Sequence, residues 1–283
     1  MSLLPATAAT PTGERHQPKT RFGSSVSRVA GEDYPAAKDR IKKNYGAPGV
    51  MRIFNSGLPS SWSSIRANLG TDAPLVVSFK ASPSDVLSGK LDDYMTTWFA
   101  EAPKTSRTFW SYYHEPEDNI DRGEFTAADY RAAWTHLADL AKTAHNWRLR
   151  PTLILMTWSV NPASHRDWHD YYAADSVKIL GWDGYNPYEP QGRYATPAEM
   201  FDRARAASKS VDLAWGIAEF GSQLAKGDQG KLRAAWLVAC AKYLKAHNSR
   251  FATYFDALFV GENDFRLLDA DSQAAWRSVV SGT

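Results

Sequence analysis

The sequence of 283 residues has a single cysteine, no long apolar run and almost no net charge. Cys240 cannot form an internal disulfide, and its place in the apolar run AAWLVACAKYL predicts a buried, unreactive thiol. Lysine and arginine exceed aspartate and glutamate by only two, 33 against 31, without any basic block, which argues against a nucleic-acid-binding protein. No segment approaches the roughly 18 apolar residues of a membrane span. We therefore expect neither nucleic acid nor membrane as a partner.

The first 20 residues, MSLLPATAATPTGERHQPKT, are rich in threonine, alanine and proline. They show no cationic region followed by a hydrophobic one, so no export signal is visible. We expect residues 1–20 to be a flexible leader or a cloning remnant. Residues 21–283 contain no linker and no internal repeat, and are expected to form one domain around one large core.

Eight short runs rich in β-forming residues alternate with segments of helical period. They begin near residues 22, 50, 74, 108, 151, 177, 214 and 252. Several runs are almost continuously apolar, which is typical of parallel strands covered on both faces. Parallel strands need crossovers, and the segment from Thr126, with Tyr130, Trp134, Leu137 and Leu140 on one stripe, predicts such a helix. Two more are predicted in TPAEMFDRARAASKS and GKLRAAWLVACAKYLKAH.

Eight strand-helix units in this length predict a single (β/α)₈ TIM barrel, a fold that typically takes about 250 residues. The main alternative is an open, doubly wound sheet. That fold usually has a glycine-rich phosphate turn after its first strand, and FGSSVSRVAGEDY contains neither G-x-G-x-x-G nor a P-loop pattern. The sequence therefore favours the closed barrel.

Two glutamates follow apolar runs at the expected carboxyl ends of strands: Glu115 in SYYHEPE, and Glu219 in WGIAEFG. Active sites of these barrels lie at that end. The fourth and seventh strands face each other across the mouth, so the two carboxyls are expected to share one small volume. Cleavage of a glycosidic bond needs such a pair, one as an acid and one as a stabilising or attacking carboxylate. A solvated loop residue or half of an ion pair is the alternative for either glutamate alone.

In the sixth predicted strand, DGYN, the alternation of side chains places Asp183 and Tyr185 on the same side. Both are expected to point into the mouth, while Trp182 and Gly184 face away. A buried tyrosine hydroxyl needs a partner, which an ionised carboxylate supplies. The alternative is that Tyr185 is a core aromatic whose hydroxyl reaches the surface.

The motifs YYHEPED, FTAADYRAAWTHL, LGWDGYNPY, WGIAEFGS and YFDALFVGENDFRLLD, in this order, resemble the signatures of glycoside hydrolase family 26. The resemblance extends from about Phe22 to the C-terminus. It implies a retaining β-glycosidase on a (β/α)₈ barrel, without a cofactor or metal. Glu115 would then be the general acid/base and Glu219 the nucleophile. Tyr185 would orient the nucleophile, and His114 would contact the sugar on the non-reducing side.

Further candidates for substrate binding come from strand ends. Trp158 and Tyr254 offer aromatic faces on which sugar rings stack, although either could be a core residue. Lys80 ends the third predicted strand, where it could meet a sugar hydroxyl or form a salt bridge. His114 could also be a structural histidine.

Two departures from the family pattern affect the substrate. After Glu115 the chain reads PEDNIDRGEFT, polar and without the aromatic pair usual in mannan-cleaving members, and Tyr254 precedes Phe255 where tryptophan is common. The predicted function is a retaining endo-β-glycanase acting on β-mannan, with β-1,3/1,4-glucan and xylan as alternatives. We expect a monomeric, extracellular protein whose partner is a polysaccharide or oligosaccharide.

The sequence argues against three other functions. A metal site of His114, Glu115, Glu117 and Asp118 fails the H-E-x-x-H pattern. An aldolase or isomerase would need a Schiff-base lysine or a phosphate loop, and only Lys80 clearly ends a strand. A non-catalytic carbohydrate-binding barrel would keep the aromatics but has no need for both glutamates.

Overall fold

Parallel strands form a closed barrel in the computed structural model, which describes residues 19–70, 73–259 and 263–282. Each strand pairs with the next along the chain, and the last pairs with the first. The strands are β1 (Arg21–Ser25), β2 (Val50–Asn55), β3 (Leu75–Phe79), β4 (Thr108–Tyr112), β5 (Leu149–Met156), β6 (Ile179–Tyr185), β7 (Ala214–Gly221) and β8 (Phe251–Tyr254). The prediction of a single (β/α)₈ barrel is confirmed, and the doubly wound sheet is wrong.

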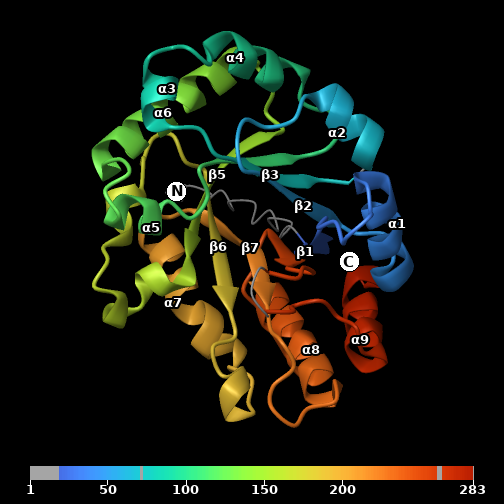
Figure 1. Cartoon of the computed structure of the whole chain (residues 1–283). Coiled ribbons are helices and arrows are strands. Elements are labelled where there is room, and N and C mark those ends of the chain that lie inside the picture. The colour runs from blue at the N-terminus through green and yellow to red at the C-terminus, as the bar shows by residue number, and fades with distance from the viewer. Residues whose placement is uncertain (1–18, 71–72, 260–262, 283) are drawn as a thin grey trace, which may run out of the picture.

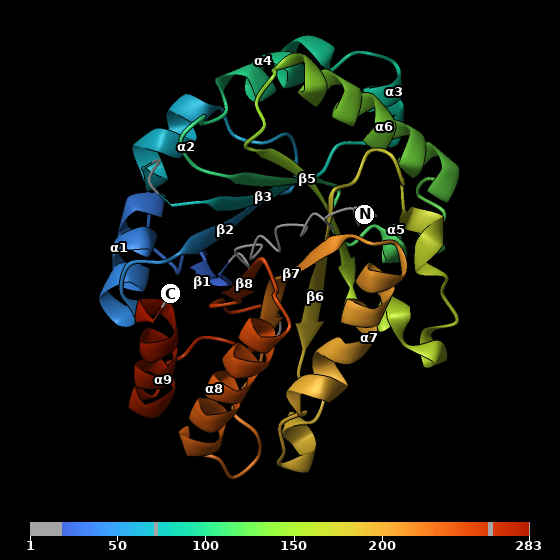
Figure 2. The ribbon, with the colours of Figure 1, turned by 180° about the vertical axis from the view of Figure 1, so that it is seen from behind.

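Helices surround the barrel, as Figures 1 and 2 show from opposite sides. They are α1 (Tyr34–Tyr45), α2 (Trp62–Leu69), α3 (Pro83–Leu87), α4 (Asp92–Glu101), α5 (Glu117–Asp121), α6 (Ala127–Thr143), α7 (Pro197–Ser210), α8 (Lys231–Ala246) and α9 (Ala270–Ser281). Most of residues 1–20, the expected leader, lie outside the described residues. Within the described ranges, no helix combines the length and apolar character needed to cross a membrane.

The connection from β5 to β6 differs from the other crossovers. Instead of an α-helix it forms short 3₁₀ turns: η1 (Thr157–Val160), η2 (Pro162–Ser164) and η3 (Trp168–Tyr171). The run TWSV, which continues the apolar segment that begins near residue 151 and was expected to be strand, is therefore η1. Another 3₁₀ turn, η4 (Glu189–Gln191), follows β6.

Side-chain caps explain where two of the predicted helices begin. Thr126 accepts a hydrogen bond from the Asp129 backbone N–H (3.0 Å) at the start of α6. At α7, Thr196 and Glu199 form a reciprocal capping box. The expected stripe of α6 faces the barrel, with Tyr130 and Trp134 fully buried.

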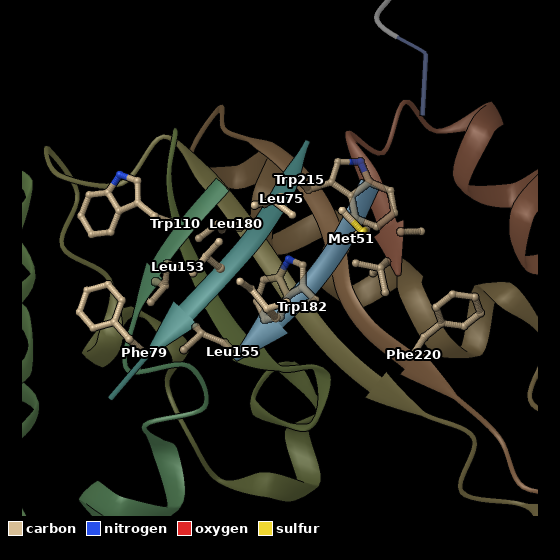
Figure 3. Close-up of a cluster of buried hydrophobic side chains, with 14 of the residues drawn as sticks. Met51, Leu75, Phe79, Trp110, Leu153, Leu155, Leu180, Trp182, Trp215 and Phe220 are labelled. Carbon is tan, nitrogen blue, oxygen red and sulfur yellow. The ribbon is translucent and has the colours of Figure 1, made fainter. Parts of the chain in front are cut away.

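The barrel has an inner and an outer apolar core. The inner core is small and fills the barrel with side chains from several strands: Val50, Val76, Phe109, Ile154, Ile179, Ala218 and Phe251. The Phe251 ring lies against Gly216, where an added Cβ would approach it to 2.7 Å, so only glycine leaves room for this ring. The larger outer core lies between strands and helices, and part of it is drawn in Figure 3. It includes Cys240, which is buried as predicted.

Candidate active site

The loop after β4 carries Glu115 in an uncommon backbone conformation. Tyr113 and Glu115 have positive φ angles of 46° and 49°, a region that costs a non-glycine residue about 1–3 kcal/mol. Neighbouring strands hold this conformation: the Tyr113 N–H donates to the Phe79 carbonyl (2.7 Å) and the Glu115 N–H to the Ile154 carbonyl (3.0 Å). The predicted fourth strand thus ends earlier, at Tyr112, while β3 and β5 still position the glutamate.

Glu219 reaches the mouth because β7 contains a bulge. Trp182 of β6 lies opposite Ile217, but the next residue, Asp183, lies opposite Glu219, so Ala218 is an extra residue. Ile217 belongs to the outer core and Ala218 to the inner one. Strict alternation would then turn Glu219 outward, toward the helices. The bulge turns it back to the mouth, where it is 7% exposed.

Two side chains bind the Glu219 carboxylate. Arg52 Nη2 donates to one oxygen at 3.0 Å and the Tyr185 hydroxyl donates to the other at 2.7 Å. The hydrogen bond that the resemblance implied for Tyr185 is therefore present. Charge-assisted contacts of this kind suit a carboxylate anion and fix its direction.

Arg52 is the main site residue that the sequence analysis missed. It lies on β2, fully buried, and its other terminal nitrogen donates to the Ile53 carbonyl (2.6 Å) and to Ser78 Oγ (2.8 Å). A signal was available: VMRIFN is an apolar strand with one arginine, and a buried arginine requires an anionic or polar partner.

Asp183 lies beside this group on β6 and is 2% exposed. Neither of its carboxyl oxygens has a hydrogen-bond partner among the described residues. Burial, and then the negative charges of Glu219 and Glu115, raise the pKa of Asp183 well above its usual range. Trp182 points the opposite way and donates to Ser208 of α7 (3.0 Å), as the alternation predicted.

Glu115 differs from Glu219 in its surroundings. It is partly exposed at the mouth, and no side chain of the described residues forms a hydrogen bond with its carboxyl group. Burial raises the pKa of Glu115 from 4.5 to about 8, and the charges of Glu219 and Glu117 add to this effect. Hydrogen bonds run from Glu219 through Arg52 and Ser78 to His114, the residue before Glu115. The loop of Glu115 and the carboxylate of Glu219 therefore lie at the same end of the barrel.

Glu117, two residues after Glu115, is a fully buried carboxyl at the start of α5. Its Oε1 accepts from the Met156 backbone N–H (2.8 Å) and from the Ser159 hydroxyl (2.7 Å). Burial raises the pKa of Glu117 to about 7. These bonds tie the Glu115 loop to η1, the turn that carries Trp158.

His114 and Lys80 both lie close to Glu115. His114 Nδ1 is 2.8 Å from Ser78 Oγ, and burial, with the charges of Arg52 and Lys80, holds the pKa of His114 well below 6.5. Lys80 Nζ lies 4.9 Å from the centre of the Tyr113 ring and forms no ion pair with a described carboxylate. Burial lowers the pKa of Lys80.

Aromatic side chains flank the carboxylates. Trp158 is 48% exposed on η1, beyond the end of β5. On the β1, β2 and β8 side, Phe54 stacks on Phe255 with ring centres 6.3 Å apart, and Phe255 packs edge-on against Tyr185. Phe54 and Phe255 line a groove of about 530 Å³. An extended ligand therefore has an apolar surface beside the mouth on the Phe54 and Phe255 side.

The expectation that Tyr254 contacts substrate is wrong. Tyr254 is fully buried, and its hydroxyl donates to the carbonyls of Ser222 (3.1 Å) and Phe265 (2.7 Å). Its ring packs edge-on against Phe220 in the outer core. The neighbouring Phe255 faces the mouth instead, because side chains alternate along β8: Phe251 lies in the inner core and Tyr254 in the outer one, so the next residue points inward again.

The residues weighed as a metal cluster are not gathered at one point. Asp118 is exposed and ion-paired with Arg166, whereas Glu117 is buried against η1. Among the described residues, no group of three or more histidine, cysteine, aspartate or glutamate side chains is placed to hold a metal ion.

Comparison with known proteins finds similar solved structures but no similar sequence. No family model matches the chain, and no curated protein matches its sequence. The catalytic domain of the GH26 endo-β-1,4-mannanase from Bacillus sp. JAMB-750 matches with a TM-score of 0.63 and 13% identity, over 93% of this chain and 86% of that one. The chain resembles family 26 mannanases in fold.

Two further structures support this likeness. A GH26 β-mannanase from Bacteroides ovatus matches with a TM-score of 0.57 and 12% identity, over 92% of this chain and 88% of the mannanase. A GH5 xyloglucan-specific endo-β-1,4-glucanase from a metagenomic library matches with a TM-score of 0.55 and 11% identity, over 90% and 95% of the two chains. At these identities the likeness to the mannanases and to the glucanase concerns the fold.

Proposed function

We propose that this protein is a glycoside hydrolase of family 26 that cleaves β-linked polysaccharides internally, with retention of configuration. The observation that carries the proposal is the contrast between its two glutamates. Glu219 is fixed by Arg52 and Tyr185, as an attacking carboxylate must be. Glu115 has a raised pKa, as an acid that keeps its proton near neutral pH must have.

The reaction would proceed by two displacements. Glu219 attacks the anomeric carbon while Glu115 gives its proton to the leaving glycosidic oxygen, so one C–O bond forms as the other breaks. Glu115, now ionised, then takes a proton from water, and the water oxygen attacks the anomeric carbon and releases Glu219. Two inversions at the same carbon return the original configuration.

The charges around Glu219 suit its part in this cycle. When Glu219 forms the glycosyl ester, its negative charge disappears, and the pKa of Glu115 falls because one of its repelling neighbours is neutral. Glu115 is then better suited to act as a base. Arg52 stays fixed by its bonds to Ile53 and Ser78. It can bind the Glu219 carboxylate again when the second step releases that carboxylate from the sugar.

The aromatic groups suggest how a polymer would lie. We propose that sugar units on the non-reducing side of the cleaved bond occupy the groove of Phe54 and Phe255, next to His114. The leaving part would pass Trp158, which is held beside the Glu115 loop. Sugar rings stack on such faces through their C–H bonds. Asp183, Tyr185 and Lys80 remain predicted substrate contacts at the floor and rim.

Among substrates, β-mannan is proposed first because both family 26 structures described above are named as mannanases. A β-1,3/1,4-glucan or a xylan is the alternative, since a structure named as a xyloglucan-specific glucanase shares the barrel. We also propose that the protein acts outside the cell, where polymeric substrates are found, and that it is a monomer.

The test is incubation with a panel of β-mannans, mixed-linkage glucans and xylans, followed by NMR of the first products. We expect internal cleavage of one polymer class and first products with the β configuration. First products with the α configuration would contradict double displacement. Loss of all cleavage in Glu219→Ala, with binding retained, separates catalysis from a carbohydrate-binding role.

A further inference from the structure

Ser78 lies at the centre of a chain of hydrogen bonds that crosses the floor of the site. It is fully buried on β3. Its hydroxyl oxygen is 2.8 Å from Arg52 Nη1 and 2.8 Å from His114 Nδ1. Arg52 continues the chain to Glu219 through its other terminal nitrogen, at 3.0 Å. The chain therefore connects the glutamate of β7 to the residue next to Glu115.

The direction of each bond follows from donor and acceptor chemistry. A guanidinium group only donates, so Ser78 Oγ accepts from Arg52 and keeps its own proton to give away. Among the described residues, the one acceptor within hydrogen-bond distance of that proton is His114 Nδ1. The reverse bond, from Nδ1–H to Ser78 Oγ, would leave the buried Ser78 proton without a partner among the described residues. Nδ1 therefore accepts, and the proton of the neutral imidazole is on Nε2.

We propose that Ser78 is a positioning residue that fixes His114 as the Nε2–H tautomer, so that His114 offers the ligand a hydrogen-bond donor at the mouth. The part of this inference that concerns the ligand rests on the proposed function; the tautomer does not. The preferred ligand group is an acceptor, such as a sugar hydroxyl oxygen or ring oxygen.

The surroundings of His114 favour the neutral ring. Burial, and then the positive charges of Arg52 and Lys80, disfavour a second ring proton and hold the pKa of His114 well below 6.5. Phe54 lies over both Arg52 and His114, with its ring centre 5.4 Å from the guanidinium carbon and 6.3 Å from the imidazole centre. Ser78 itself is fully buried, so its bond to His114 lies away from solvent at the Ser78 end.

The direct test is long-range ¹H–¹⁵N NMR of the histidine rings in the full chain at neutral pH, with His114→Gln assigning the His114 signals. We expect the wild-type protein to show a neutral His114 with the proton on Nε2. Ser78→Ala should shift the signals toward a tautomer mixture, and Ser24→Ala, a buried serine of β1 outside this chain of bonds, should leave them unchanged. A wild-type Nδ1–H tautomer, or signals unchanged in Ser78→Ala, would overturn the proposal.

Kinetics give the second readout. Loss of one oriented hydrogen bond should reduce kcat/KM about five- to tenfold in Ser78→Ala, and Ser78→Thr, which keeps the hydroxyl, should recover part of it. If Ser78→Ala does not fold, the tautomer of His114 in the wild-type protein still tests the proposal, because an Nδ1–H tautomer would overturn it. A wild-type protein that shows the Nε2–H tautomer but cleaves no glycan would refute the proposed function and leave the assignment of Ser78 intact.

Discussion

The raised pKa of Glu115 has a consequence for stability that can be measured without any substrate. Its folded-state pKa is about 8, compared with an ordinary value of 4.5. Between these pH values the folded protein holds a proton that the unfolded chain releases. The free energy of unfolding therefore falls as the pH rises through this window, and Glu115 adds no slope below or above it.

The size of the effect follows from the shift. A difference from 4.5 to about 8 is about 3.5 units, and each unit corresponds to about 1.4 kcal/mol, so the ionised Glu115 costs the fold about 5 kcal/mol at high pH. Glu115→Gln keeps the shape of the neutral acid and removes this cost. We expect the variant to match the wild-type stability at pH 4 and to exceed it by up to about 5 kcal/mol at pH 9.

Urea unfolding followed by circular dichroism at one-unit intervals from pH 4 to pH 9 measures this difference. Glu101→Gln is the matched control, because it makes the same substitution at an exposed position on α4, outside the site. If the stability difference between Glu115→Gln and the wild type does not change with pH, Glu115 is not held protonated by burial and by its neighbours, and the assignment of the acid fails.

Three further predictions concern the site. Arg52→Met leaves Glu219 buried without its counter-ion and should destabilise the fold by about 3–5 kcal/mol, most of which Arg52→Met combined with Glu219→Gln should restore in the same urea assay. Tyr185→Phe removes one donor to Glu219 and should lower kcat at least tenfold with a smaller change in KM, measured on the polymer that is cleaved. Trp158→Ala should raise KM several-fold while leaving the melting temperature within about 2 °C, because the indole is half exposed; an unchanged KM would remove Trp158 from the substrate path.

Much of the barrel could be predicted because its strands are apolar on both faces and its helices have amphipathic stripes. Thr126 and Thr196 marked helix starts by their capping chemistry, and both caps are present. The β5–β6 connection could not be predicted, since TWSV reads as a continuation of an apolar strand. The turn depends on Glu117, which lies 42 positions from Ser159 in the sequence. The buried Glu117 carboxyl accepts a hydrogen bond from the Ser159 hydroxyl and so holds the turn.

In the site, too, features set by the local sequence could be predicted, whereas features set by packing against distant segments could not. Strand order alone predicted that Glu115 and Glu219 would meet at the mouth, but not the bulge at Ala218 that turns Glu219 inward. Period-two reasoning placed Asp183 and Tyr185 correctly relative to Trp182. It put Tyr254 on the wrong face of β8, because which of two alternating faces turns inward depends on packing against strands that lie far away in the sequence.

The most direct test of the double displacement is to trap its covalent intermediate. The protein is incubated with a 2-deoxy-2-fluoro glycosyl fluoride of the sugar identified by the polymer panel, and intact mass and peptide mass spectrometry then locate the label. We expect one glycosyl group per chain, attached to Glu219, with labelling abolished in Glu219→Gln. A label on any other residue, or rapid turnover of the reagent without a labelled protein, would contradict the assignment of Glu219 as the nucleophile.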